Sequence, residues 1–316
     1  MNAVSHRARR GKRKGRAAGA RSGPVSVLQL IELGARRLRR ARVFFGHGTD
    51  SARDDSAALV LHALRLPHEP SVYSRRVSAA ARQRAEDLIT RRIEQRIPAV
   101  YLTGETWFAG LPFYVDSRVL IPRSPLAELI ERQFIPWIQP ARVRHILDMG
   151  TGSGCIAVAC AKAFPRARVD AVDVSAAALE VARINLRRHR LGRRVSLVKS
   201  DHFRALSGES YDIIVANPPY VGARELRSLP PEYRHEPRMA LAAGRAGLDS
   251  VKVILKEAGR HLRPRGILVV EVGNTAAAVR RAYRHLPFTW LEFERGGGGV
   301  FLLTAAELAD GITHVR

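Results

Sequence analysis

The sequence lacks the features of secreted and membrane proteins. It has only two cysteines, Cys155 and Cys160, and both fall in one predicted helix, so they cannot form a disulfide framework. No apolar run reaches the ~18 residues of a transmembrane helix, and the N-terminus has no apolar core typical of a secretion signal. These absences predict a cytoplasmic protein without a membrane partner.

Acidic residues are also scarce. The chain has 29 Asp and Glu against 53 Lys and Arg, which gives a formal net charge of +24. Such an excess attracts nucleic acid, and arginine favours planar contacts to phosphate. The charge does not identify nucleic acid as a substrate, because an enzyme whose protein target is surrounded by RNA would have the same excess.

Charge and hydrophobic periodicity divide the 316 residues into five parts. Residues 1–24 are rich in Lys and Arg without an acid, which predicts a disordered basic tail with affinity for RNA. A solubilising extension and an organellar targeting peptide are alternatives. Residues 25–100 have helical periodicity and predict a small substrate-recognition domain. Residues 101–123 contain a β-hairpin connector, 124–306 an α/β domain, and 307–316 a tail.

Three helices are expected in the small domain. The first has its apolar face between 27 and 38, the second begins at Asp54, and the third runs over 79–96 with Ser78 as its N-cap. His47 lies in the glycine-containing loop between the first two helices. It could contribute to a site, but a single loop histidine is more often structural or solvated.

A glycine turn follows the first predicted strand of the α/β domain. Residues 143–148 are apolar and end at Asp148, and an apolar helix begins at Cys155; between them lie Gly150, Thr151, Gly152 and Gly154. Glycine permits positive φ and close backbone approach, and the free N–H groups of a helix start face a ligand. The G-x-G-x-G spacing favours a nucleotide-type cofactor and weakens a dinucleotide interpretation.

Acidic residues end three successive predicted strands. Asp148 ends the first, Asp173 the second, and Asp201 follows the third, with His202 next to it. An acid at the position of Asp173 can bridge the two hydroxyls of a ribose, and Asp201 can accept from an adenine amino group. Each acid alone could be a helix N-cap, but three at successive strand ends predict a nucleoside-cofactor site.

The fourth predicted strand, 211–216, runs directly into Asn217-Pro218-Pro219-Tyr220. Two prolines stop the strand, so the loop is held rigidly where ligands bind in open α/β sheets. The Asn217 side-chain oxygen and the Pro218 carbonyl can each accept one hydrogen of a planar NH2 group, and Tyr220 can pack on the group that carries it or face a cation. A plain turn after a buried strand is the alternative.

A long polar insertion, from Val221 to about Asp249, follows this loop and is expected to cover the acceptor. Its Glu232, His235 and Glu236 lack a convincing metal-ligand spacing, so no metal site is predicted. We interpret each as a solvated loop charge, although Glu236 could brace the mouth of the site. Arg123 could reach substrate or cofactor, or form an ion pair between domains.

The remaining pattern completes the sheet. A helix over 251–262, a strand over 265–271 and a helix over 275–285 precede two strands, 289–294 and 299–304, joined by a glycine turn. The predicted fold is α/β, with a seven-stranded Rossmann-like sheet of the class I methyltransferase type and a small N-terminal helical domain joined by a β-hairpin.

The glycine turn with Asp148, Asp173 and the Asn217–Tyr220 loop resembles the S-adenosylmethionine-dependent methyltransferases that modify amino or amide NH2 groups. Loops of this type occur in enzymes that act on adenine and in enzymes that act on glutamine. The resemblance implies that S-adenosyl-L-methionine is the cofactor.

Further motifs are similar to those of the bacterial ribosomal-protein glutamine N5-methyltransferases, whose target lies in the third large-subunit ribosomal protein. The similarity runs from about 27 to 304, and its motifs are 45–50, 107–111, 120–125, 232–237 and 296–301. The sister family that methylates release factors typically has Pro-Arg-Pro-Asp-Thr-Glu where this chain has Pro-Arg-Ser-Pro-Leu-Ala-Glu at 122–128. That family also has an aromatic residue at the position of His202, so adenine stacking there does not carry over.

The resemblance implies methyl transfer to a glutamine amide nitrogen in a large-subunit ribosomal protein, with ribosomal RNA as a further contact of the basic surface and tail. Three alternatives stay open. Release-factor methylation uses the same chemistry on another protein, and adenine methylation in nucleic acid would require base flipping. The third is an RNA-binding assembly factor with an inactive fold, which the intact Asn217, Pro218, Gly150 and Gly152 disfavour.

Overall fold

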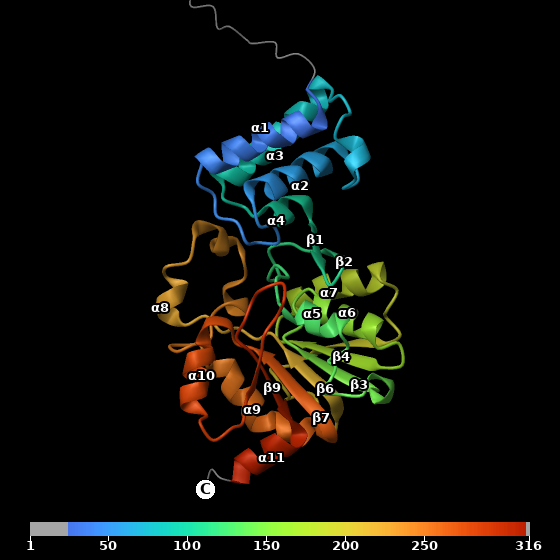
Figure 1. Cartoon of the computed structure of the whole chain (residues 1–316), viewed down its shortest axis with the longest axis vertical. Coiled ribbons are helices and arrows are strands. Elements are labelled where there is room, and N and C mark those ends of the chain that lie inside the picture. Colours follow the sequence, from blue (N-terminus) through green and yellow to red (C-terminus); the bar gives the residue numbers. More distant parts are fainter. Residues whose placement is uncertain (1–24, 314–316) are drawn as a thin grey trace, which may run out of the picture.

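A computed structural model describes residues 25–313, so the predicted basic tail lies outside the described residues. Figure 1 shows a small helical domain at one end of the molecule and the α/β domain at the other, with a β-hairpin between them. This order agrees with the parts expected from the sequence.

The small domain packs four helices around one apolar core. They are α1 (Val27–Arg40), α2 (Ala52–Leu64), α3 (Ala79–Glu94) and the short α4 (Ala99–Thr103), with the 3₁₀ turn η1 (Pro70–Val72) before α3. Ser78 caps α3 as predicted, accepting from the N–H of Ala81 at 3.3 Å. α2 begins before Asp54 because Ser51 is its N-cap, and α4 had not been predicted.

The predicted hairpin forms from β1 (Glu105–Phe108) and β2 (Leu111–Tyr114), which pair antiparallel. Phe113 of β2 is buried in the core of the α/β domain. Asn185 fixes the hairpin to that domain: its side-chain oxygen accepts from the N–H of Tyr114 at 2.8 Å, and its amide donates to the carbonyls of Tyr114 and Ser153. The connector is therefore held against the end of the glycine turn, where α6 begins.

The large sheet has the seven strands that the sequence predicts. Their order is β5-β4-β3-β6-β7-β9-β8, with β5, β4, β3, β6 and β7 parallel and β9 antiparallel to both β7 and β8. The strands are β3 (His145–Met149), β4 (Arg168–Asp173), β5 (Val195–Lys199), β6 (Tyr211–Ala216), β7 (Leu262–Glu271), β8 (Thr289–Leu291) and β9 (Val300–Thr304). The order reverses between β3 and β6, which places a crevice at their carboxyl ends.

Helices cover both faces of this sheet, so its central strands are apolar on both sides. One core contains residues of α5 (Leu126–Glu131), α6 (Cys155–Ala163) and α7 (Ala176–Arg188). The opposite core contains residues of α9 (Asp249–His261), α10 (Ala276–Ala282) and α11 (Ala305–Thr313). Short 3₁₀ turns, η2 (Pro140–Arg142) and η5 (Gly273–Thr275), lie before β3 and α10.

The α/β domain continues past the expected boundary at 306. Residues from 305 onward form α11, and its Leu308 is fully buried against the sheet. The tail predicted for 307–316 is therefore helical as far as 313, because apolar positions of this segment have a core to pack against.

The insertion after β6 forms α8 (Ala223–Leu226) and the 3₁₀ turns η3 (Pro231–His235) and η4 (Arg238–Ala240). Figure 1 shows that this insertion, which includes α8, extends from the α/β domain towards the small domain. Backbone hydrogen bonds between Val221 and Leu241, and between Ala243 and Val221, close its base. From 25 to 313, no helix combines the length and apolar character needed to cross a bilayer.

Candidate active site

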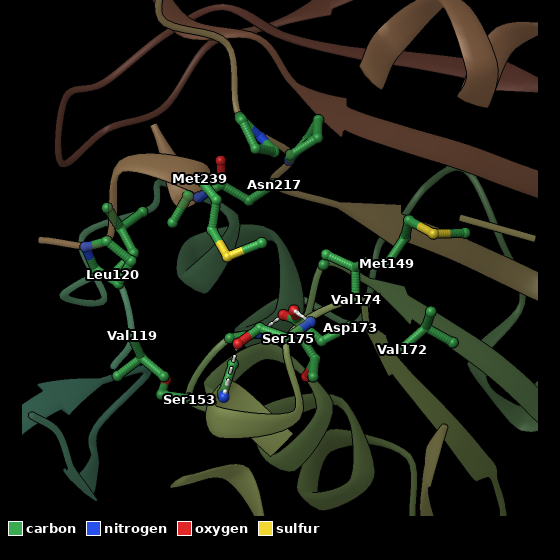
Figure 2. Close-up of a pocket in the computed structure, with 18 of the residues that line it drawn as sticks. Val119, Leu120, Met149, Ser153, Val172, Asp173, Val174, Ser175, Asn217 and Met239 are labelled. Atoms are coloured by element: carbon green, nitrogen blue, oxygen red, sulfur yellow. Dashed lines mark hydrogen bonds between the residues drawn. The ribbon is translucent and has the colours of Figure 1, made fainter. Parts of the chain in front are cut away.

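A cavity of about 250 Å³ lies at the carboxyl ends of β3, β4, β5 and β6. Its lining includes the proposed site residues Gly150, Thr151, Gly152, Asp173, Asp201, His202, Asn217 and Pro218. Figure 2 shows Asn217 and Met239 on one side of this cavity and Asp173, Ser175 and Ser153 on the other. A larger hollow of about 830 Å³ lies on the small domain, but it lacks the strand-end acids and the glycine turn.

The glycines of the turn have two different roles. Gly150 and Gly152 have φ of +76° and +53°, and a Cβ built on either would meet no atom closer than 3.9 Å, so it would project into the cavity. A Cβ at Gly154, whose φ is +80°, would instead lie 3.2 Å from the Cβ of Ala182 on α7. The first two therefore keep space open for a ligand, while the third lets α7 pack closely.

Asp148 does not line the cavity. Its Oδ2 accepts from the Thr151 hydroxyl at 2.5 Å and from the N–H of Ala157 at 3.0 Å, so it braces the glycine turn against α6. Complete burial raises the pKa of this carboxyl from 3.8 to about 7. Its Oδ1 has no hydrogen-bond partner within the described structure.

Asp173 lies at the end of β4 and lines the cavity. Its Oδ2 accepts from the N–H of Gly152 at 2.9 Å, and its Oδ1 accepts from the N–H of Ser175 at 2.8 Å. Burial raises the pKa of this carboxyl. Next to it, the hydroxyl of Ser153 is buried without a hydrogen-bond partner in the described chain. A ligand with several hydroxyl or amino groups would find both oxygens of the Asp173 carboxylate here.

Asp201 and His202 border the same cavity after β5. The Nδ1 of His202 lies 2.8 Å from Asp201 Oδ1, and His202 has a positive φ of +53°. Neighbouring strands therefore carry the acids in the order Asp201, Asp173, Asp148, as the sequence predicted. Of these three acids, Asp173 and Asp201 line the cavity, where their carboxylates can accept hydrogen bonds from a nucleoside.

Tyr220, predicted to pack on the group that carries the NH2 or to face a cation, does not line the cavity. Its hydroxyl donates to Glu271 Oε1 at 3.1 Å, and the same carboxylate accepts from the Ser124 hydroxyl. A Cβ built at Gly273 would lie 2.6 Å from the Tyr220 ring, so the ring packs directly on that backbone. Tyr220 thus anchors the loop that presents Asn217 and Pro218. The sequence placed Glu271 at a strand end without indicating this role.

The wall beyond Asn217 combines the connector with the insertion. Residues 118–124 and 237–242 contribute to it, with the exposed side chain of Met239 at the edge. Arg123 forms a bidentate ion pair with Glu236, with N–O distances of 2.5 and 2.8 Å, and the N–H of Ile121 donates to Glu236 Oε1 at 3.2 Å. Apolar and paired groups therefore enclose the acceptor side.

Two of the insertion charges are not solvated. Glu236 is 4% exposed and Glu232 is fully buried, so the interpretation of these glutamates as solvated loop charges is wrong. Their burial depends on arginines more than a hundred residues earlier in the chain. His235 is half-buried, and its Nε2 lies 2.8 Å from the carbonyl oxygen of Gln95.

His47 is buried beneath this wall. Its ring lies 4.4 Å from that of Tyr233, and burial together with Arg123 and Arg92 lowers its pKa from 6.5 to about 3. The ring is therefore buried and not solvated, and neither of its nitrogens has a hydrogen-bond partner among the described residues. Between 25 and 313, no group of three or more His, Cys, Asp or Glu side chains could hold a metal ion.

The chain is similar to known methyltransferases over most of its length. The family model named methyltransferase small domain matches residues 131–229. The ribosomal protein uL3 glutamine methyltransferase of Bordetella pertussis is 46% identical over 90% of this chain and 96% of its own length. That of Neisseria meningitidis serogroup A is 44% identical over 90% and 94%. Among solved structures, the catalytic domain of hMettl16 with an RNA hairpin is 20% identical, with a TM-score of 0.49 over 79% of this chain and 90% of that one.

Proposed function

Because this chain belongs to the ribosomal protein uL3 glutamine methyltransferases, we propose that it methylates the side-chain amide nitrogen of a glutamine in uL3. One observation of the structure supports this proposal independently of family membership. Asn217 and Pro218 line the same cavity as the glycine turn and Asp173. An NH2 acceptor can therefore lie beside a nucleoside-bound methyl donor.

The methyl donor is S-adenosyl-L-methionine, whose sulfonium supplies an electrophilic methyl group. The residues present fit it: Gly150 and Gly152 leave open space, Asp173 offers two carboxylate oxygens, and the Ser153 hydroxyl has no partner in the described chain. Asp173 would hold ribose hydroxyls and Asp201 the adenine amino group. Asp148 acts through Thr151, which it fixes in the glycine turn.

Orientation of the acceptor is the main task of the Asn217 loop. An amide nitrogen is a poor nucleophile because its lone pair is delocalised into the carbonyl. The Asn217 side-chain oxygen and the Pro218 carbonyl accept its two hydrogens, which directs the lone pair at the methyl carbon. Holding reactants in this way supplies much of an enzymatic rate. The Glu271–Tyr220 hydrogen bond and the glycine contacts of Tyr220 keep the loop in place.

A strong general base is not required beforehand, because the amide nitrogen becomes acidic once it is methylated and then releases a proton to water. Apolar side chains of the connector and insertion, among them Val119 and Leu120, border the acceptor and limit its contact with water, while the exposed edge at Met239 leaves the proton a path to bulk solvent. Exclusion of water strengthens the hydrogen bonds that orient the amide.

The decisive experiment is labelled methyl transfer. Purified uL3 and a release factor are incubated separately with the protein and S-adenosyl-L-methionine that carries a labelled methyl group. Label on a glutamine of uL3 is expected; label only on the release factor would move the substrate to the sister family. Mass spectrometry of uL3 from cells with and without the protein tests the same assignment in vivo.

Two further controls test whether the protein is instead a nucleic-acid methyltransferase or a non-enzymatic RNA-binding protein. Label recovered in RNA or DNA would establish adenine methylation. Failure to bind S-adenosyl-L-methionine in calorimetry would support a non-enzymatic RNA-binding role. The proposed substrate places the reaction in the cytoplasm, where ribosomal proteins assemble.

Contact with ribosomal RNA is the remaining part of the proposal. It is supported by the net charge of +24, since phosphate attraction scales with such an excess. Binding of ribosomal RNA should weaken steeply as salt rises, and removal of residues 1–24 should reduce that dependence. Equal affinity for the full and shortened chains would remove the tail from this role.

A further inference from the structure

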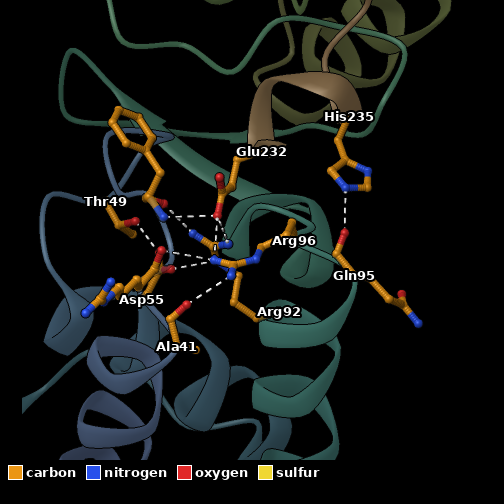
Figure 3. A network of polar contacts seen from close by, with 10 residues as sticks. Ala41, Thr49, Asp55, Arg92, Gln95, Arg96, Glu232 and His235 are labelled. Atoms are coloured by element: carbon orange, nitrogen blue, oxygen red, sulfur yellow. Dashed lines mark hydrogen bonds and ion pairs between the residues drawn. The ribbon is translucent and has the colours of Figure 1, made fainter. Parts of the chain in front are cut away.

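A buried carboxylate of the insertion reaches into the small domain. Glu232 in η3 is fully buried, and its Oε1 accepts from the N–H of Phe44 at 3.0 Å and from Arg92 Nη1 at 3.3 Å. Arg96 Nη1 lies 3.6 Å from the same oxygen. Figure 3 shows Glu232 descending from the insertion onto Arg92 and Arg96.

Arg92 of α3 is held by partners from the small domain as well. It is 1% exposed, its Nε donates to Asp55 Oδ2 at 2.8 Å, and its Nη2 donates to the carbonyl of Phe44 at 2.6 Å. A buried charge that loses one of its partners is strongly unfavourable. The insertion and the small domain are therefore held in one relative position by Glu232 Oε1 and Arg92, while Glu232 Oε2 has no hydrogen-bond partner among the described residues.

A second carboxylate lies four residues further along the insertion. Glu236 accepts hydrogen bonds from Arg123 and from the N–H of Ile121, both in the connector. The residues that follow it directly, Pro237, Met239 and Ala240, line the cavity opposite the cofactor acids. Contacts thus run without a gap from α3 through Glu232 and Glu236 to the wall that faces Asn217.

We propose that the small domain positions the acceptor wall of the active site through Glu232, so that it promotes methyl transfer itself in addition to binding the substrate protein. Glu232 and Arg92 are then positioning residues that act through Glu236 and the 237–240 segment. This inference rests on the proposed function. A domain that only recognised uL3 would change the KM for uL3 and leave kcat unaltered.

The test is Glu232→Gln, which keeps the length of the side chain and removes its charge. Because the wall is in place only when the charges are paired, kcat with saturating uL3 should fall by about tenfold or more. The Kd of S-adenosyl-L-methionine should stay within about twofold, since Asp173 and the glycine turn do not contact Glu232. Glu94→Gln is the matched control: Glu94 is exposed at the end of the same α3 helix, and both constants should keep their wild-type values.

A raised KM with unchanged kcat in Glu232→Gln would overturn the proposal, and so would wild-type values of both. If Glu232→Gln does not fold, Glu236→Gln decides in its place, because it breaks the same path at the connector. Loss of kcat with retained cofactor affinity is again the supporting result, and unchanged kcat is the contrary one.

Failure of the proposed function is separable from failure of this inference. Wild-type protein that transfers no label to uL3 removes the substrate assignment alone. Positioning is then read from amide hydrogen exchange over 221–248, which needs no substrate. Exchange over 237–242 should be faster in Glu232→Gln than in wild type and in Glu94→Gln; equal exchange in all three would end the proposal.

Discussion

The two sides of the cavity, which we propose hold the cofactor (the cofactor half) and the acceptor (the acceptor half), are constructed in opposite ways. The cofactor half lies within residues 148–202, and Asp173 is only 21 residues from Gly152, whose N–H it accepts. The acceptor half joins segments that are far apart in the chain: Arg123 and Glu236 are separated by 113 residues, and Arg92 and Glu232 by 140. One half is thus local and the other depends on the complete fold. Substitutions should affect cofactor affinity and turnover separately.

The largest difference between the effect on kcat and the effect on cofactor affinity is expected for Asn217→Ala. Loss of one of the two acceptors that orient the amide should lower kcat by ~100-fold or more, about 2.7 kcal/mol of barrier. Cofactor affinity should be retained, because the cofactor half is held by its own strand ends. Steady-state kinetics and calorimetry measure the two effects. Asn274→Ala, an exposed amide outside the cavity, is the control, and near-wild-type turnover in Asn217→Ala would refute the assigned role.

Asp173→Ala should have the opposite effect: it should weaken cofactor affinity and leave kcat nearly unchanged. Hydrogen bonds to a charged group contribute roughly 1.5–3 kcal/mol, so the Kd of S-adenosyl-L-methionine should rise about 10- to 100-fold. At saturating cofactor, kcat should remain close to that of the wild type. Calorimetry that finds unchanged affinity would remove Asp173 from the cofactor half.

Tyr220→Phe tests whether the anchor of the loop belongs to the acceptor half. It removes the hydrogen bond to Glu271, worth about 1 kcal/mol, so kcat should fall about fivefold with unchanged cofactor affinity. Tyr283→Phe, at a partly buried tyrosine at the end of α10 and outside the cavity lining, is the matched control. A loss as large as that of Asn217→Ala would instead mean that the hydroxyl takes part in the reaction.

The smallest change in turnover is expected for Asp148→Asn, whose effect appears in stability. The folded-state pKa of Asp148 is about 7, above its ordinary 3.8. Between pH 4 and 7 the unfolded chain releases a proton that the native state keeps, so this group makes the free energy of unfolding fall as the pH rises. Denaturant titrations from pH 4 to 8 should give a flatter profile for the variant. An unchanged profile would mean that Asp148 ionises normally in the ligand-free protein.

The sequence predicted the strands and the glycine turn of the cofactor half because their signals are local. β6 spans the residues predicted for it, β4 ends at the predicted Asp173, and β5 ends just before Asp201, since each strand is a short apolar run with a polar residue at or after its end. Asp148 is the exception, because it braces the turn and does not line the cavity. The glycine turn and the acids of the strand ends follow from their places in these runs. The seven-stranded sheet follows from the alternation of strands and helices, whereas the order of its strands was not predicted.

The acceptor half was predicted less completely. Glu232 and Glu236 have the local sequence of ordinary loop glutamates. Nothing near them in the chain indicates that they pair with Arg92 and Arg123. Tyr220 was predicted to pack on the group that carries the NH2 or to face a cation, but its partner Glu271 lies 51 residues away and draws the hydroxyl out of the cavity. Pairing over such distances is decided by tertiary packing, which a single sequence does not display.

The distance between Arg92 and Glu232 also has a consequence for synthesis. Chains grow at about 5–20 residues per second, and N-terminal domains fold first. Arg92 therefore emerges with Asp55 and the Phe44 carbonyl as partners, while Glu232 follows 140 residues later. The helical domain on a nascent chain is an unfinished one, and it reaches its full stability only after the ribosome has translated most of the enzyme.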